Sequence, residues 1–216
     1  MGLAYRIMLK IEKLSHQYQQ SKVLQISHWE LARGQSWLIL GSSGSGKTTL
    51  LHLIAGILKV QEGHIWWQNT DLAQLSESAR DQLRAQNIGL VFQKPHLLPS
   101  LSVLKNLRLA QTLSRQKGNR QACLEVLEKL GLSEKMNALP HQLSQGQAQR
   151  AAIARALVHQ PALLLADEPT ASLDDANAET VVQLLIDLSQ SQGSSLVIAT
   201  HDQRVIKHFT NIQKLD

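Results

Sequence analysis

The most constraining feature of this chain is a glycine-rich loop between an apolar strand and an apolar helix. Residues 41–48 read GSSGSGKT, which fits the pattern GxxxxGK[ST] at every fixed position. The apolar run from Trp37 to Leu40 leads into this loop, and the helical pattern TTLLHLIAGIL from Thr48 to Leu58 follows it. A strand, this loop and a helix in that order predict a phosphate-binding unit on a parallel sheet.

The residue types in the loop suit a bound triphosphate better than a merely flexible glycine-serine loop. The glycines allow backbone N–H groups to converge on phosphate oxygens, and the helix N-terminus adds the positive end of its dipole. Lys47 supplies a charge for the β and γ phosphates, and the Thr48 hydroxyl is placed to ligate Mg²⁺. The residues predicted to bind ATP here are Gly41, Ser42, Ser43, Gly44, Ser45, Gly46, Lys47, Thr48 and Thr49.

Two further strands end in residues that could complete this site. Asp167 and Glu168 follow the buried run ALLLA, and His201 directly follows SSLVIAT. Ligands bind at the carboxyl ends of parallel strands, so these side chains are expected near the phosphate loop. There Asp167 would act through Mg²⁺, Glu168 would lie close to an attacking water, and His201 could reach the γ phosphate.

Composition excludes several other classes of protein. The 216-residue chain has a formal net charge of +5, but its basic residues are spread along the sequence, so nucleic-acid binding is not expected. The longest apolar stretches are strand-sized and far short of the roughly 20 residues that a membrane-crossing helix needs. The N-terminus has no secretory pattern, and the single Cys123 can form no internal disulfide, so a cytoplasmic protein is expected.

A second motif, Leu143-Ser144-Gln145-Gly146-Gln147, resembles the LSGGQ signature of the ABC transporter ATPase family. Ser144 and Gln147 have the spacing of a capping box, which presents a helix N-terminus to an anion. The resemblance implies that Ser144, Gly146 and Gln147 face the γ phosphate of an ATP held by a second copy. It therefore implies a homodimer arranged head to tail across ATP.

Other stretches extend the resemblance over nearly the whole chain. Gln93 is similar to the glutamine that senses the metal and couples the sheet to the helical subdomain. Tyr18 lies where the family usually has an aromatic stacked on adenine. Residues 172–174 resemble the loop that crosses the dimer interface, His201 resembles the switch histidine, and Glu168 resembles the general base.

Within the family, the sequence is most similar to the LolD, FtsE and MacB group, in the segments DLAQLSESARDQLR and IGLVFQKPHLLPSLSVLKNL and in LLADEPT. This implies an ATPase that drives a separate membrane permease in lipoprotein release, cell-division control or efflux, and that does not touch the transported substrate. Gln145 stands where glycine is usual, and the crossing loop reads TASLD where TGNLD is common. Neither departure removes Ser144, Gly146, Glu168 or His201.

Three alternatives remain open from the sequence. An ABC ATPase with a ribosomal or DNA-repair partner would usually carry two cassettes or a coiled-coil insertion, and this chain has neither. A P-loop kinase of small metabolites would not account for LSQGQ or for the histidine after the last strand. An inactive binding module is suggested by Gln145 alone.

The expected fold class is α/β, a P-loop NTPase with a RecA-like parallel-sheet core, an antiparallel β subdomain and an α-helical subdomain. One domain over residues 1–216 is expected, with the core and β subdomain at about 1–94 and 161–216 and the helical subdomain at about 95–160. A final helix and a short tail are expected after SSLVIAT.

Overall fold

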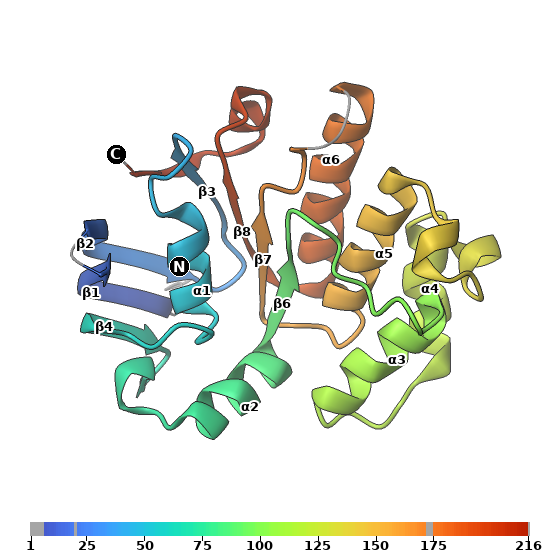
Figure 1. Ribbon diagram of the computed structural model, residues 1–216, viewed down its shortest axis with the longest axis horizontal. Helices are drawn as coiled ribbons and strands as arrows, with labels where there is room; N and C mark the ends of the chain where they lie inside the picture. The colour runs from blue at the N-terminus through green and yellow to red at the C-terminus, as the bar shows by residue number, and fades with distance from the viewer. Residues whose placement is uncertain (1–6, 20, 172–174, 216) are drawn as a thin grey trace, which may run out of the picture.

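The computed structural model describes residues 7–19, 21–171 and 175–215, and its centre is a five-stranded parallel sheet (Figure 1). The strand order is β6-β7-β8-β3-β9. All neighbouring strands in this sheet run parallel. The strands are β3 (Ser36–Gly41), β6 (Ile88–Val91), β7 (Leu163–Asp167), β8 (Ser195–Thr200) and β9 (Asn211–Leu215).

A second, four-stranded sheet has the order β2-β1-β4-β5, and its neighbouring strands run antiparallel. It consists of β1 (Ile7–Tyr18), β2 (Ser21–Ala32), β4 (Glu62–Trp67) and β5 (Thr70–Asp71). Strands β1 and β2 form a hairpin that closes at the pair Tyr18 and Ser21. Both sheets agree with the expected fold class.

Six α-helices lie among the described residues, and most begin at a polar cap. They are α1 (Lys47–Ile54), α2 (Glu77–Asn87), α3 (Val103–Leu113), α4 (Arg120–Lys129), α5 (Gln145–Leu157) and α6 (Asp175–Gln192). Short 3₁₀ turns occupy Leu72–Gln74, Ser133–Lys135, Pro140–Gln142 and Gln203–His208. Ser76, Ser102, Asn119 and Ser144 each accept a hydrogen bond from a backbone N–H in the first turn of α2, α3, α4 and α5.

Two hydrophobic cores cover the two faces of the parallel sheet. Successive residues of β3 separate between them, with Leu38 in one core and Ile39 in the other, as the alternation of a strand requires. Helix α1 packs between the two sheets, whereas α3, α4, α5 and α6 lie beyond the opposite face (Figure 1). A parallel sheet buried on both faces leaves its strand ends as the place for a polar site.

The end of the chain differs from the expectation. After β8 the chain forms a 3₁₀ turn, Gln203–His208, and then the strand β9, which pairs in parallel with β3 at the edge of the sheet. The five-residue segment NIQKL is too short for its pattern to predict a strand, and the strand it pairs with lies far away in the sequence. Helix α1 is also shorter than expected and ends at Ile54. Across the described part of the chain, no helix has the length and apolar character to cross a membrane.

Candidate functional site

The glycine-rich loop forms one wall of a cavity of about 270 Å³ at the carboxyl ends of the parallel strands. Helix α1 begins at Lys47, directly after the loop, so its free N–H groups point into this space. The predicted residues Ser43, Gly44, Gly46, Lys47, Thr48, Thr49, Gln93, Glu168 and His201 line the cavity, together with Val23. The structure thus gathers residues from four separate segments that the sequence singled out.

Lys47 is buried to 5% exposure and points back along the loop. Its Nζ donates hydrogen bonds to the carbonyl oxygens of Gly41, at 2.9 Å, and of Ser42, at 2.8 Å. The same Nζ lies 3.3 Å from Oε1 of Glu168. The ammonium group therefore stands between the phosphate loop and the acidic strand end, where it can exchange these partners for phosphate oxygens.

Asp167 is not part of the cavity lining but pairs with Thr48, which is part of it. The Thr48 hydroxyl donates a hydrogen bond to Oδ2 of Asp167 at 2.7 Å. Oδ1 of the same carboxylate is buried and has no hydrogen-bond partner in the part of the chain that the structure describes. Burial raises the pKa of Asp167 above its ordinary value, despite the opposing hydrogen bond from Thr48.

These oxygen groups fit a divalent cation. Mg²⁺ prefers oxygen ligands and is usually held by one or two carboxylates together with substrate phosphates. The unpartnered Oδ1 of Asp167, the Thr48 hydroxyl and the nearby Gln93 amide are ligands of that kind. A bound cation would also remove the cost of keeping the Asp167 carboxylate ionised while buried.

Glu168 is held by three neighbours. Thr200 donates its hydroxyl to Oε2 at 2.7 Å, and the His201 ring contacts Oε1 through Nδ1 at 2.9 Å. An ionised carboxylate only accepts, so Nδ1 carries the proton in this arrangement. Burial alone would raise the pKa of Glu168, but the hydrogen bonds from His201 and Thr200 and the charge of Lys47 outweigh it and hold the pKa below its usual value.

The backbone at Glu168 is also strained. Its φ of 45° lies in the left-handed region, which glutamate rarely adopts. The Glu168 N–H donates to the carbonyl oxygen of Ala199 at 2.8 Å, which fixes this conformation to the neighbouring strand. Strain of this kind persists where surrounding structure holds a residue in a functional orientation. The carboxylate consequently faces the phosphate loop with little freedom to turn away.

The remaining loop residues lie around the cavity rather than in its lining. Gly41 and Ser42 line an adjacent hollow together with His201, and the Ser45 hydroxyl is buried without a hydrogen-bond partner among the described residues. Tyr18 stands at the end of β1 with 49% of its surface exposed, outside the lining of the cavity.

The second motif lies at the start of α5 and contributes no residue to this cavity. Ser144 accepts a hydrogen bond from the Gln147 backbone N–H at 3.3 Å, and the Gln147 side chain accepts one from the Ser144 N–H at 3.0 Å. This confirms the predicted capping box. Ser144 and Gln145 are exposed, and a Cβ at Gly146 would meet no atom of the described residues within 4 Å. Residues 172–174, the predicted crossing loop, lie outside the described residues.

Two members of the site were missed from the sequence. Thr200 could have been suspected, because it immediately precedes His201 at a strand end. Val23 could not be predicted as a site residue, because an apolar residue in an early strand is expected to lie in the hydrophobic core. It enters the site because the β1–β2 hairpin folds over the phosphate loop, where the Val23 carbonyl lies against Gly46.

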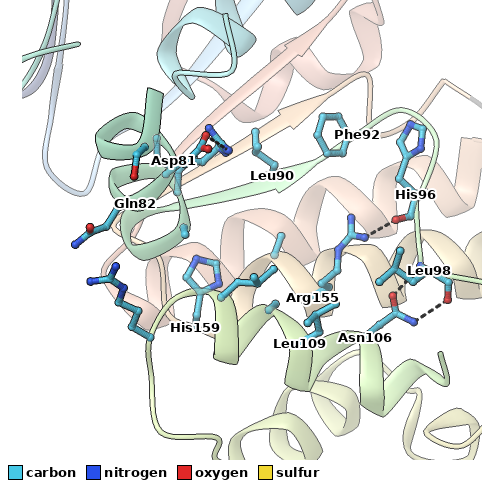
Figure 2. A pocket seen from close by; sticks show the side chains of 18 residues that line it. Asp81, Gln82, Leu90, Phe92, His96, Leu98, Asn106, Leu109, Arg155 and His159 are labelled. Carbon is cyan, nitrogen blue, oxygen red and sulfur yellow. Dashed lines mark hydrogen bonds and ion pairs between the residues drawn. The ribbon is translucent and has the colours of Figure 1, made fainter. Parts of the chain in front are cut away.

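A larger groove of about 690 Å³ is separate from the phosphate cavity (Figure 2). Its lining is mainly apolar and comes from α2, β6, α3, α5 and the segment after β6, with Leu90, Phe92 and Leu109 among the residues. Figure 2 shows Arg155 reaching from α5 to this segment, where its guanidinium donates to the carbonyl oxygens of Pro95 and His96. The groove thus lies where the parallel sheet meets the helices α3 and α5.

Comparison with protein families adds a further finding. The family model described as ABC transporter matches residues 24–171. Two curated relatives are LolD ATP-binding proteins of the lipoprotein-releasing system. The one from Legionella pneumophila (strain Lens) is 40% identical over 212 residues, covering 95% of this chain and 93% of its own. The one from Idiomarina loihiensis is 36% identical over 214 residues, covering 96% and 94%.

A solved structure is similar in fold and sequence. The ATP-binding cassette MJ0796, in a dimeric post-hydrolysis state bound to ADP and Pi, superposes with a TM-score of 0.89 at 33% identity. The match covers 97% of this chain and 94% of the other.

Proposed function

Since this chain belongs to the ABC transporter family and is an ATP-binding, ATP-hydrolysing subunit, we propose that it works as a head-to-tail homodimer. In this proposal, the dimer closes over two ATP molecules and energises a separate membrane permease. The permease is of the lipoprotein-release or efflux type, as in LolD and MacB. Substrate does not touch the subunit, and nucleic acid is not a partner.

The observation that carries the proposal is the position of Glu168. Its carboxylate lines the phosphate cavity, and Thr200, His201 and Lys47 all contact it. A pKa held below the usual range keeps the carboxylate ionised at neutral pH, so it can accept a hydrogen bond from a water beside the γ phosphate. Glu168 then orients that water and takes its proton, while His201 keeps the carboxylate aligned.

The other residues have electrostatic and positional roles. Lys47 leaves its loop carbonyls for the β and γ phosphates, and backbone N–H groups of Ser43, Gly44 and Thr49 surround them. Gln93 lies across the cavity, where its amide can sense the metal. Tyr18 offers an aromatic surface for adenine. Phosphoryl transfer needs mostly such positioning and charge stabilisation, which these residues supply.

Thr48, Asp167 and Gln93 would hold Mg²⁺. When bound, the cation neutralises charge on the phosphate oxygens. Asp167 suits this role through its unpartnered Oδ1, and Thr48 is already fixed against the same carboxylate.

A second copy completes the site in this proposal. The N-terminus of α5 is exposed, capped by Ser144 and Gln147, and open above Gly146. Facing the phosphate cavity of another copy, it would present N–H groups and a dipole to the γ phosphate. The dimeric state of MJ0796 with ADP and Pi supports this reading.

The permease is proposed to dock in the larger groove (Figure 2). The mainly apolar lining includes three arginines, Arg84, Arg115 and Arg155, against one carboxylate, Asp81, which suits a short amphipathic segment that carries acidic residues. The groove borders both the sheet and the helices of the proposed helical subdomain at about 95–160, so a partner seated there touches both. Through this contact the subunit would lie on the cytoplasmic face of the membrane.

The catalytic part is tested with Glu168→Gln and the exposed control Glu125→Gln. Glu168→Gln should bind ATP, lower phosphate release by about a hundredfold or more, and accumulate as a dimer with ATP and Mg²⁺. The control should match the wild type. Phosphate release without an acceptor separates an ATPase from a kinase, and near-normal turnover in Glu168→Gln contradicts the role of Glu168 as general base.

Lys47→Ala should lose ATP affinity, and unchanged affinity contradicts the role of Lys47 in phosphate binding.

The partner is tested by affinity purification of Glu168→Gln from detergent-solubilised membranes with ATP and Mg²⁺. A permease with a large extracytoplasmic domain should co-purify. The permease should no longer co-purify when the variant also carries Leu113→Ser at the groove, and it should be retained with Ile57→Ser. Ile57 is the matched control because both side chains are exposed and only Leu113 lines the groove. Recovery of ribosomal or DNA-repair proteins instead would withdraw the transport partner and leave the ATPase.

A further inference from the structure

The end of β1 holds a buried histidine that the proposed mechanism does not use. His16 is 4% exposed, and neither of its ring nitrogens has a hydrogen-bond partner in the described structure. Buried polar atoms normally have partners, so hydrogen bonding does not account for a histidine at this position, and its ring contact is the feature to consider. An apolar side chain such as leucine would suit this buried strand position equally well, as Leu14 does at the neighbouring buried position.

The ring of His16 contacts the ring of Tyr18. The two rings meet near the end of β1, where the pairing with β2 shifts register between His16 and Gln17. Their centroids are 4.9 Å apart and their planes are inclined by 77°, which is an edge-to-face arrangement. His16 is enclosed, whereas 49% of Tyr18 remains exposed. The buried ring therefore supports an aromatic side chain that is open to a ligand.

Tyr18 stands beside the phosphate cavity. It pairs with Ser21 where the β1–β2 hairpin closes, and Val23 of the same hairpin lines the cavity. A Cβ at Gly46 would lie 2.4 Å from the Val23 carbonyl oxygen, so the hairpin rests directly on the phosphate loop. The base of a nucleotide whose phosphates lie in the loop would extend away from them, and Tyr18 offers an exposed aromatic surface on the hairpin that covers the loop.

We propose that His16 is a positioning residue for the nucleobase, fixing the ring of Tyr18 so that the base of ATP stacks on a preset surface. This rests on the proposed function of Tyr18. His16 touches neither the phosphates nor the reacting atoms, so it sets affinity for the base and leaves phosphate binding alone. A fixed platform loses less side-chain freedom on binding than a mobile one.

The test compares two ligands that differ in the base. Affinities for ATP and for inorganic tripolyphosphate, both with Mg²⁺, are measured by calorimetry for the wild type, His16→Leu, His16→Phe, Tyr18→Leu and the double variant His16→Leu with Tyr18→Leu. His28→Leu, on an exposed part of β2, serves as the matched control. Melting temperatures identify any variant that fails to fold.

His16→Leu should weaken ATP binding by about three- to tenfold, the cost of ordering on binding a Tyr18 side chain that the His16 ring no longer holds, and leave tripolyphosphate unchanged. His16→Phe keeps the ring contact and should stay within about twofold of the wild type. In the Tyr18→Leu background, His16→Leu should have no further effect. These results would support a positioning role that a general loss of packing does not mimic.

Other outcomes overturn the proposal. Equal losses for ATP and tripolyphosphate would mean that His16 acts on the phosphate loop. Additive losses in the double variant would mean that it acts independently of Tyr18, and a His16→Phe variant as weak as His16→Leu would mean that the ring nitrogens matter. If Tyr18→Leu leaves ATP affinity unchanged while Lys47→Ala abolishes it, the base platform fails and the ATPase function stands.

Discussion

Gly46→Ala should destabilise the protein more than Gly44→Ala, although both glycines lie in the same loop. The two share a left-handed backbone, with φ of 88° at Gly46 and 85° at Gly44. They differ in their surroundings. A Cβ on Gly46 would lie 2.4 Å from the carbonyl oxygen of Val23, whereas a Cβ on Gly44 would have no atom of the described part of the chain within 4 Å.

The expected losses of stability follow from the left-handed backbone and from the contact with Val23. A left-handed φ costs an L residue about 1–2 kcal/mol, and this applies to both variants. At Gly46 the obstacle is a backbone atom of β2, so the hairpin must also move, which adds an overpacking cost of about 1–3 kcal/mol. Gly44→Ala should therefore lose about 1–2 kcal/mol of unfolding free energy, and Gly46→Ala roughly 2–5 kcal/mol.

Urea unfolding of the nucleotide-free protein, followed by tryptophan fluorescence, measures the difference. The two variants should unfold with equal slopes and different midpoints, because the change is in stability and not in the surface exposed. Equal losses in both variants would refute the reasoning, since the hairpin would then not rest on the loop at Gly46. Gly46→Ala should also weaken ATP binding, because displacing Val23 changes the wall of the phosphate cavity.

Three further predictions concern Asp167, the cap of α5 and Asp202, the residue after His201. Because burial raises the pKa of Asp167 above 3.8, the contribution of this carboxyl to the stability of the nucleotide-free protein should fall as pH rises from there through its folded-state pKa. Asp167→Asn lacks this titration, so the melting temperature of the wild type should fall relative to that of Asp167→Asn as pH rises, and a constant difference contradicts this. Ser144→Ala removes the cap of α5 and should cost about 1 kcal/mol in urea unfolding, and no loss would deny the cap a role in stability. Hydrogen bonding to Arg204 lowers the pKa of Asp202 to about 2, so stability from this carboxylate is present above its ordinary pKa and lost as pH falls through about 2. Arg204→Ala should shift the Asp202 titration, followed by NMR, upward, and an unmoved titration contradicts the pairing.

Much of the site could be predicted because it lies at the ends of parallel strands. The strand before Gly41, the strand before Asp167 and the strand before His201 were each recognisable from local pattern. Parallel neighbours bring their carboxyl ends to one edge, so three separate motifs could be expected to meet there. The capping box at Ser144 was also predictable, because it depends only on two residues three positions apart in the sequence.

What escaped prediction depends on contacts between distant segments. The pairing of β9 with β3 and the approach of Val23 to Gly46 are set by how the sheets assemble, which local pattern does not encode. The burial of His16 is of the same kind. A histidine two residues before an aromatic gives no sign in the sequence that its ring is enclosed and in contact with that aromatic.

Two adjacent residues connect the two cavities of the molecule. Phe92 lines the larger groove, and Gln93 lines the phosphate cavity. The carbonyl oxygens of Phe92 and of Pro169, the residue after Glu168, both accept hydrogen bonds from the Gln149 side chain of α5. If a permease binds in the groove as proposed, it can displace Phe92. That displacement would reach Gln93 through one peptide bond, and the segment after Glu168 through the Gln149 side chain. Coupling between partner and hydrolysis then needs no long pathway, because the groove and the reacting centre share this short segment as a wall.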